Sequence, residues 1–125
     1  MNLDAVLGLE PHKMGSLVNP KVKQALSYMA AQYHGPLKLT VVASRIGIHP
    51  SHLCRLFKKE LGMPFRRCIL IMRLHKARQL LAESEKSIKQ ISFEIGFGCP
   101  EAFSRAFKRQ MGCPPGQYRK HHRQG

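Results

Sequence analysis

A short basic helix pattern occurs twice in this chain, fifty residues apart. Residues 53–65 place leucine and phenylalanine at helical spacing, so one face packs inward while arginine and lysine point elsewhere. Residues 103–115 repeat the pattern, with matches at Arg55 and Arg105, Phe57 and Phe107, Lys58 and Lys108, Gly62 and Gly112, and Pro64 and Pro114. The glycine predicts a left-handed helix stop, and the proline prevents continuation. Two copies of one helix indicate one task done twice.

The segment before each copy indicates which task this is. Ala43 lies four residues before Gly47, and Ser92 lies four residues before Gly96. Glycine adopts positive φ without steric cost, and a small residue lets the next helix approach closely. These features are typical of a helix-turn-helix, whose second helix enters the DNA major groove. One match would be weak evidence, but two in tandem, each followed by a basic helix, predict a pair of DNA-reading units.

The charge balance points to the same kind of partner. The chain has 125 residues, with 21 Lys and Arg against 7 Asp and Glu, for a net charge of +14. Residues 38–125 hold 18 of the basic residues and five of the acidic ones. Such an excess implies a polyanionic partner, most often nucleic acid. A solvated basic surface would explain the charge alone, but the coincidence with the tandem motif favours DNA.

Several other functions find no support in the sequence. The four cysteines form no C-x-x-C pair, and neither a signal peptide nor an apolar run near ~18 residues is seen, which predicts a cytoplasmic protein with reduced thiols. A zinc site needs three or four converging ligands, and only a chance assembly of His49 and His52 with Cys54 would supply three, so no metal or cofactor is expected. No phosphate-binding or dinucleotide glycine fingerprint and no catalytic constellation appear, so we expect no enzyme activity.

The predicted fold is an all-α, seven-helix tandem helix-turn-helix domain joined by a long central helix. We expect a linker or flexible tail at 1–18, a DNA-binding domain at 19–120 and a basic tail at 121–125. Within the domain, subdomains at 19–63 and 83–120 flank a central helix at 64–82. The expected helices of the first part are 19–34, 39–46, 50–61 and 64–82. The second part is expected to hold a helix that opens with a capping box at 87–90, a helix at 100–111 and a short helix that ends at Tyr118. A helix of about 20 residues spans ~30 Å, close to the ~34 Å of one DNA turn, and would suit a spacer between two readers.

The run from Leu39 to Arg119 resembles the DNA-binding domain of AraC/XylS-type transcription regulators. The residues that carry the resemblance are Ala43, Gly47, Pro50, Leu53, Arg55, Phe57, Lys58, Arg73, Leu74, Ala77, Leu80 and Leu81 in the first half, and Ile88, Ile91, Gly96, Phe97, Phe103, Ser104, Arg105, Phe107, Lys108, Gly112, Pro114, Tyr118 and Arg119 in the second. The resemblance covers about two-thirds of the chain. It implies seven helices and two recognition helices in adjacent major grooves on one face of double-stranded DNA. It also implies sequence-specific regulation of transcription, more often as an activator that contacts RNA polymerase.

The sequence departs from the family pattern at the start of both recognition helices. His49 replaces a serine, and Gly98 and Cys99 replace the usual serine and aspartate. Both helices are therefore expected to lack a capping side chain, worth ~1 kcal/mol. Many members also carry an N-terminal effector or dimerisation domain. The chain is either a short stand-alone member or the C-terminal domain of a longer regulator, and the linker-like composition of residues 1–18 favours the second reading.

The candidate DNA-contacting residues fall into two groups. The candidates for reading bases are Ser51, His52, Cys54 and Arg55 in the first motif, and Glu101, Ala102, Ser104 and Arg105 in the second. The candidates for contacting phosphate are Lys38, Lys58, Lys59, Ser87, Lys89, Lys108 and Arg109. Arg55 would alternatively form a surface ion pair with Glu60. Glu101 would either accept from cytosine N4 or replace the lost cap at its helix N-terminus.

Two alternative functions remain open at this point. The excess of charge fits a non-specific architectural DNA-binding protein. The apolar run from Cys68 to Met72 fits a protein-interaction module, because five consecutive helical residues cannot all face one core. Ile71 belongs to neither apolar stripe of the central helix, so we expect it to be largely exposed. It would either mark a partner surface or be a single exposed isoleucine, which is common and needs no explanation.

Overall fold

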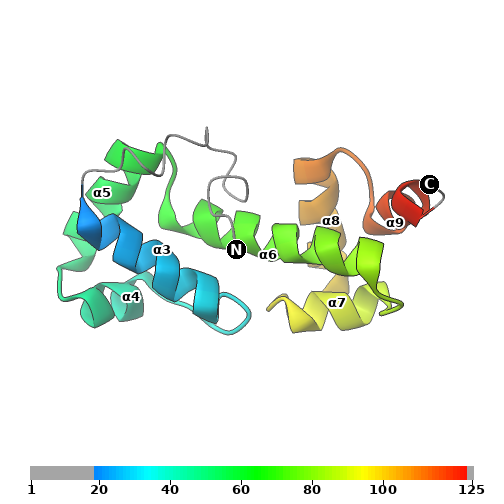
Figure 1. Ribbon diagram of the computed structural model, residues 1–125, viewed down its shortest axis with the longest axis horizontal. Helices are drawn as coiled ribbons and strands as arrows, with labels where there is room; N and C mark the ends of the chain where they lie inside the picture. The colour runs from blue at the N-terminus through cyan, green and yellow to red at the C-terminus, as the bar shows by residue number, and fades with distance from the viewer. Residues whose placement is uncertain (1–18, 124–125) are drawn as a thin grey trace. The chain divides into compact units, whose positions relative to one another are not determined.

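The computed structural model describes residues 19–123 (Figure 1). Over that range the regular structure consists of α3 (Pro20–Gln32), α4 (Leu39–Ile46), α5 (Pro50–Leu61), α6 (Phe65–Glu83), α7 (Ile88–Glu94), α8 (Pro100–Met111) and α9 (Pro115–Arg123). These seven helices, with no strand among the described residues, confirm the predicted all-α fold class. The expected linker at 1–18 lies outside the described residues. The chain divides into two compact units between Met72 and Arg73, and each unit is described by itself.

The first unit packs α3, α4, α5 and the start of α6 around one apolar core. Its fully buried members are Val22, Ala25, Leu26, Met29, Val42, Ala43, Leu53, Phe57, Cys68 and Met72. Helix α3 begins where the sequence predicted, because the Asn19 side chain accepts a hydrogen bond from the Lys21 backbone N–H at 2.8 Å. The Lys21 ammonium group then donates to the Ile46 carbonyl at 2.9 Å, which ties the start of α3 to the end of α4.

The second unit combines the rest of α6 with α7, α8 and α9. Its buried apolar residues are Leu74, Ala77, Leu81, Ile91, Ile95, Phe103 and Phe107. Neighbouring aromatic rings pack in series, with Phe103 and Phe107 centred 5.8 Å apart and Phe107 and Tyr118 centred 5.4 Å apart in an edge-on arrangement. Because Tyr118 belongs to α9, this contact holds α9 against α8.

The turn inside each helix-turn-helix is closed by the same pair of backbone hydrogen bonds. After α4, Gly47 N–H donates to Ser44 O at 3.3 Å and Ile48 N–H donates to Ala43 O at 3.0 Å. After α7, Gly96 N–H donates to Phe93 O at 3.2 Å and Phe97 N–H donates to Ser92 O at 2.8 Å. This is the hydrogen-bond pair of a Schellman motif, which requires positive φ at the glycine. The values are +76° at Gly47 and +97° at Gly96, so the predicted role of both glycines is confirmed.

The apolar run in α6 is buried more completely than the sequence suggested. Phe65, Ile69 and Met72 are all buried in the core of the first unit. Ile71 is half-buried and packs against that same core, so the expectation that it is largely exposed is wrong. The sequence indicates only two apolar stripes on α6. The core of the first unit also contacts the side of the helix that carries Ile71, which lies in neither stripe.

Helix α9 is longer than expected. It continues past Tyr118 to Arg123, so residues 121–123 of the predicted basic tail are helical. The ring of His122 stacks on that of Tyr118, with centroids 3.8 Å apart, and His122 Nδ1 lies 2.9 Å from the Tyr118 carbonyl oxygen. These contacts span one helical turn and support the extension, which composition alone did not indicate.

Candidate nucleic-acid interface

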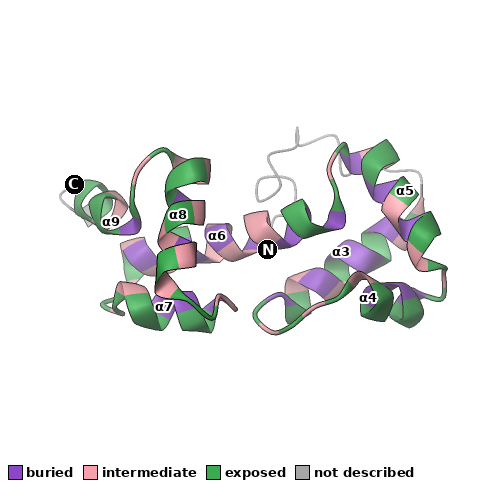
Figure 2. Ribbon diagram, turned by 180° about the vertical axis from the view of Figure 1, so that it is seen from behind, coloured by how far each residue is buried: buried purple, intermediate pink, exposed green. Residues whose placement is uncertain are grey.

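Helix α5 presents most of its polar side chains to solvent because its apolar residues are held in the core (Figure 2). Leu53 and Phe57 are fully buried, and Arg55 between them is exposed. The other candidates on this helix are also accessible: Ser51, His52, Lys58 and Lys59 are exposed, and Cys54 is half-buried. The structure thus brings the first set of predicted residues onto the solvent side of one helix.

Helix α8 repeats this arrangement in the second unit. Phe103 and Phe107 are fully buried, and Arg105 between them is exposed. Glu101, Lys108 and Arg109 are exposed, and Ala102 and Ser104 are half-buried. Both helices carry two basic residues in the last turn and end at a glycine with positive φ, Gly62 at +70° and Gly112 at +87°. The two units therefore offer the same kind of basic helical face.

The starts of the two recognition helices differ from each other. His49 Nδ1 accepts a hydrogen bond from the Ser51 backbone N–H at 3.1 Å, so the expectation that α5 lacks a capping side chain is wrong. The imidazole nitrogen occupies the position of the side-chain oxygen in an ordinary cap. At α8 the expectation holds, because Cys99 makes no capping hydrogen bond to the backbone.

Glu101 lies in the first turn of α8 and interacts with the residue that fails to cap it. The Cys99 thiol donates a hydrogen bond to its carboxylate, with Sγ and Oε2 3.1 Å apart. That hydrogen bond, followed by one from the Glu101 backbone N–H, lowers the pKa of the carboxyl below its usual value of 4.5. A stable negative charge at a helix N-terminus is favourable. This geometry supports the capping alternative for Glu101.

Glu60 is engaged elsewhere than with Arg55. Its Oε1 accepts a hydrogen bond from the Asn19 backbone N–H at 3.1 Å, which links the end of α5 to the start of α3. Lys86 and Glu94 form an ion pair in the second unit, and Arg55 takes part in none among the described residues. Arg55 and Glu60 therefore do not form the alternative ion pair, and Arg55 is exposed to solvent.

The remaining phosphate candidates lie at the starts of α4 and α7. Lys38 is exposed at the N-cap of α4, which has no side-chain cap. At α7, Ser87 Oγ accepts from Gln90 N–H at 3.0 Å and Gln90 Oε1 accepts from Ser87 N–H at 2.8 Å, so the predicted capping box is confirmed. The Ser87 hydroxyl still has its proton to donate, and Lys89 is exposed beside it.

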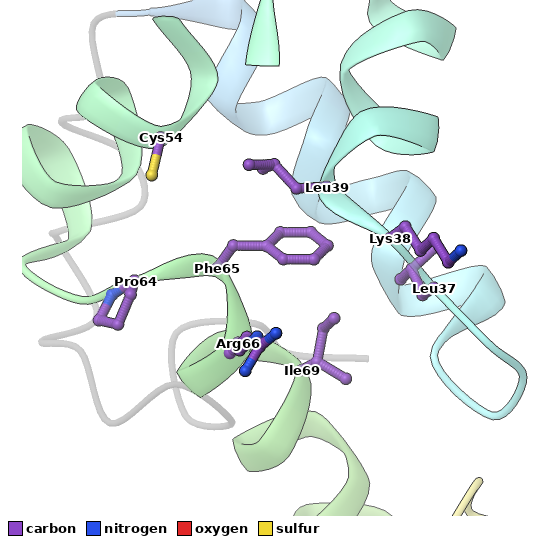
Figure 3. A pocket seen from close by; sticks show the side chains of 8 residues that line it. All are labelled: Leu37, Lys38, Leu39, Cys54, Pro64, Phe65, Arg66 and Ile69. Atoms are coloured by element: carbon purple, nitrogen blue, oxygen red, sulfur yellow. The ribbon is translucent and has the colours of Figure 1, made fainter. Parts of the chain in front are cut away.

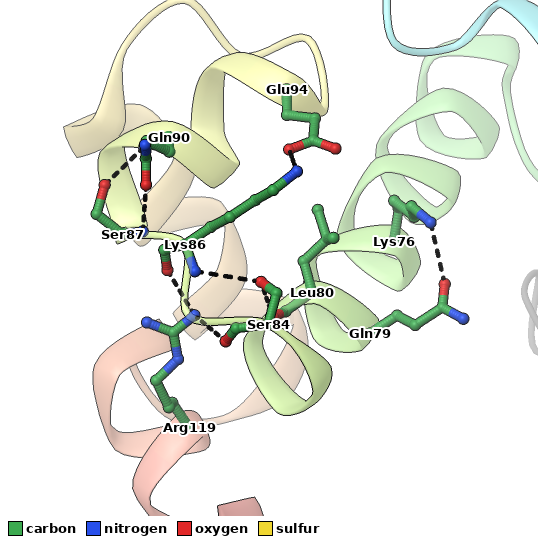
Figure 4. Close-up of polar contacts among 9 residues, drawn as sticks. All are labelled: Lys76, Gln79, Leu80, Ser84, Lys86, Ser87, Gln90, Glu94 and Arg119. Atoms are coloured by element: carbon green, nitrogen blue, oxygen red, sulfur yellow. Dashed lines mark hydrogen bonds and ion pairs between the residues drawn. The ribbon is translucent and has the colours of Figure 1, made fainter.

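Sequence reasoning missed the role of Arg119, which holds the chain that leads into α7. Arg119 Nε donates to the Leu81 carbonyl at 3.0 Å. Its Nη2 donates to the carbonyls of Ser84 at 3.2 Å and Lys86 at 2.6 Å (Figure 4). One guanidinium from α9 thus holds the segment between α6 and α7. Arg119 was identified from the resemblance, but its partners are backbone oxygens more than thirty residues away, which no side-chain pattern records.

Metal and membrane sites receive no support from the described part of the chain. Between residues 19 and 123, no three His, Cys, Asp or Glu side chains converge to hold a metal ion. Over the same residues, every helix is too short or too polar to cross a membrane.

Comparisons with known proteins agree with this geometry. A family model described as a helix-turn-helix domain matches residues 42–121. The HTH-type transcriptional regulator GlxA of Rhizobium meliloti is 37% identical over 102 residues, which make up 82% of this chain and 32% of GlxA. The lactose operon transcription activator of Staphylococcus xylosus is 30% identical over 105 residues, 84% of this chain and 38% of that protein. The chain thus spans about a third of the length of these curated relatives.

A solved structure matches over a larger share of its own length. The transcriptional regulator from Chromobacterium violaceum, described as containing an AraC-type DNA-binding domain, superposes with a TM-score of 0.80 and 35% sequence identity. The match covers 82% of this chain and 92% of that one. The chain therefore belongs to the AraC/XylS family of transcription regulators and carries that family's helix-turn-helix DNA-binding domain.

Proposed function

We propose that this domain binds specific sequences of double-stranded DNA, with each unit placing its recognition helix in one of two adjacent major-groove segments. The observation that carries the proposal is the equivalent placement of Arg55 on α5 and Arg105 on α8. Each arginine is exposed between two fully buried apolar residues. A guanidinium held in this way by a rigid helix can donate two hydrogen bonds to O6 and N7 of guanine.

The neighbouring side chains take complementary roles in this proposal. Ser51, His52, Cys54, Ala102 and Ser104 flank the arginines and contact base edges, whereas Lys38, Lys58, Lys59, Ser87, Lys89, Lys108 and Arg109 contact phosphates. Phosphate contacts set the register of the protein on the duplex without reading sequence. We assign Glu101 chiefly to stabilising the start of α8, because the Cys99 thiol already occupies one of its carboxylate oxygens.

The regulatory role follows from the relatives by analogy. One relative is named a lactose operon transcription activator. We propose that this protein too acts mainly as an activator in the cytoplasm, through a contact with RNA polymerase and with an N-terminal effector or dimerisation domain outside the matched region. The second candidate function, a non-specific architectural DNA-binding protein, is favoured only by the net charge of +14.

A selection of bound sequences from a random DNA pool, carried out with this chain alone, distinguishes the two functions. Specific binding predicts an enriched motif with two halves and an affinity for it ~10³-fold or more above that for random DNA. Affinity should fall ~10³–10⁵-fold between 50 and 200 mM salt if six to ten phosphates are contacted. Steep salt dependence without enrichment would favour the architectural function, and a flat salt response would contradict both.

A further inference from the structure

A groove of about 580 Å³ lies in the first unit, beside the recognition helix (Figure 3). Three segments form it: the start of α4, the middle of α5 and the start of α6. Its lining residues are Leu37, Lys38, Leu39, Cys54, Pro64, Phe65, Arg66 and Ile69. In Figure 3 the Phe65 ring extends from the start of α6 toward Leu39, so these two side chains make the floor where α4 and α6 approach each other.

The groove combines an apolar floor with a positive rim. Phe65 and Ile69 are buried, and Leu39 is half-buried. Lys38 and Arg66 are both exposed, and no acidic side chain lines the groove. Within the described part of the chain, neither cation takes part in an ion pair. The positive rim therefore favours an anionic ligand, and the apolar floor favours a ligand that also has an apolar surface.

The groove is continuous with the candidate DNA interface. Cys54 lines it from α5, only one residue from Arg55. Lys38 lines it from the N-cap of α4, where no side chain caps the helix. The first backbone N–H groups of a helix have no intrahelical partner and carry a partial positive charge that favours phosphate. A DNA strand whose bases face α5 would run directly past these groups.

We propose that this groove binds the sugar-phosphate backbone of one DNA strand, with Arg66 as a phosphate contact that pairs with Lys38 across the rim. The deoxyribose faces the apolar floor formed by Phe65 and Leu39, and the phosphate oxygens accept hydrogen bonds from the two cations. Arg66 contributes affinity and register without reading bases. The inference rests on the proposed DNA-binding function and adds a contact outside both helix-turn-helix segments.

Arg67 provides a matched control for Arg66. It is the next residue on α6 and is also exposed, but it does not line the groove. Arg66→Ala should weaken binding to the selected site and to random duplex alike, by roughly three- to tenfold, and lower the salt slope by about 1. Arg67→Ala removes the same charge and should have a clearly smaller effect. Equal effects of the two substitutions would mean that only long-range charge matters, and would overturn the proposal.

Ethylation interference locates the contact on the DNA. Ethylating single phosphates of the selected site should reveal one or two positions, beside the half read by α5, at which the modification weakens binding of the wild-type chain. These positions should lose their effect with Arg66→Ala and keep it with Arg67→Ala. An unchanged pattern with Arg66→Ala overturns the groove assignment, while Arg55→Ala still tests base reading independently. Octanoate, an anion with an apolar chain, tests the other kind of occupant. If it raises the melting temperature of the wild-type chain but not of Arg66→Ala, and the ethylation pattern is unchanged by Arg66→Ala, the groove is a small-ligand site and the proposal is wrong.

Discussion

Arg119 Nη2 donates a hydrogen bond to the Lys86 carbonyl oxygen at 2.6 Å, the shortest of three that this guanidinium makes to the end of α6 and the segment that follows it. The segment ends at Ser87, which caps α7. Arg119 therefore sets where the second helix-turn-helix begins, although it lies on the last helix of the unit. A planar group with several fixed donors suits three carbonyls in a way that a lysine ammonium does not.

Replacing Arg119 should destabilise the second unit. Arg119→Ala removes three hydrogen bonds from a charged donor, and we expect a loss of roughly 1.5–3 kcal/mol in unfolding free energy, measured by urea titration of the helical circular dichroism. Arg119→Lys should recover only part of this loss. Lys120→Ala, at the exposed next position, should be nearly neutral. Equal urea midpoints for Arg119→Ala and Lys120→Ala would show that the three hydrogen bonds contribute nothing.

Gly47, in the turn of the first helix-turn-helix, allows backbone strain to be tested separately from steric clashes of an added side chain. A Cβ atom at Gly47 would meet nothing within 4 Å, but φ is +76°. Gly47→Ala should therefore cost roughly 1–2 kcal/mol from the left-handed conformation alone. Gly47→Asn should cost less, because asparagine tolerates this region better. Gly98→Ala serves as the control, since that position is also open and has no positive φ. A Gly47→Ala chain as stable as the Gly98→Ala chain would contradict the strain argument.

Because α5 has a capping side chain and α8 does not, substitutions at the two caps should change stability in opposite directions. His49→Ala removes the cap of α5 and should cost ~0.5–2 kcal/mol, while His49→Asn should retain most of the stability. Cys99→Ser supplies a hydroxyl at the uncapped start of α8 and should stabilise the protein by several tenths to ~1 kcal/mol. Thermal melts of the three variants check both signs. A stabilising His49→Ala, or a destabilising Cys99→Ser, would show that the caps are assigned incorrectly.

The cysteines should differ sharply in reactivity. Cys68 is fully buried, and desolvation raises the pKa of its thiol from 9.0 to about 11. The folded state therefore keeps this proton where the unfolded state releases it, so stability should fall as pH rises from about 9 to about 11. Iodoacetamide at pH 8 should modify the exposed Cys99 quickly and leave Cys68 unmodified until urea unfolds the chain. Labelling of Cys68 at the rate of Cys99 would contradict its burial.

The repeated features of the chain could be predicted from sequence because they are local. Capping, helical spacing and the glycine stops are set by residues within four positions of each other, and the bounds of α4, α5 and α8 match the expected helices. The half-buried state of Ile71 and the partners of Arg119 depend on elements far away in the chain. The Arg66 groove is also formed by three separate segments. His49 was missed for a different reason, since histidine is an uncommon cap whose ring orientation decides the contact.

The central claim is that Arg55 reads a base while Lys58, one helical turn on, contacts only phosphate. The most direct measurement compares the affinities of Arg55→Ala and Lys58→Ala for the selected site and for random duplex at one salt concentration. We predict that Arg55→Ala costs ~1–3 kcal/mol on the selected site, relaxes the preference at one base position and changes random binding little, whereas Lys58→Ala weakens both equally. If Arg55→Ala weakens the selected site and random duplex by the same factor, Arg55 does not read sequence and the proposed recognition mechanism is wrong.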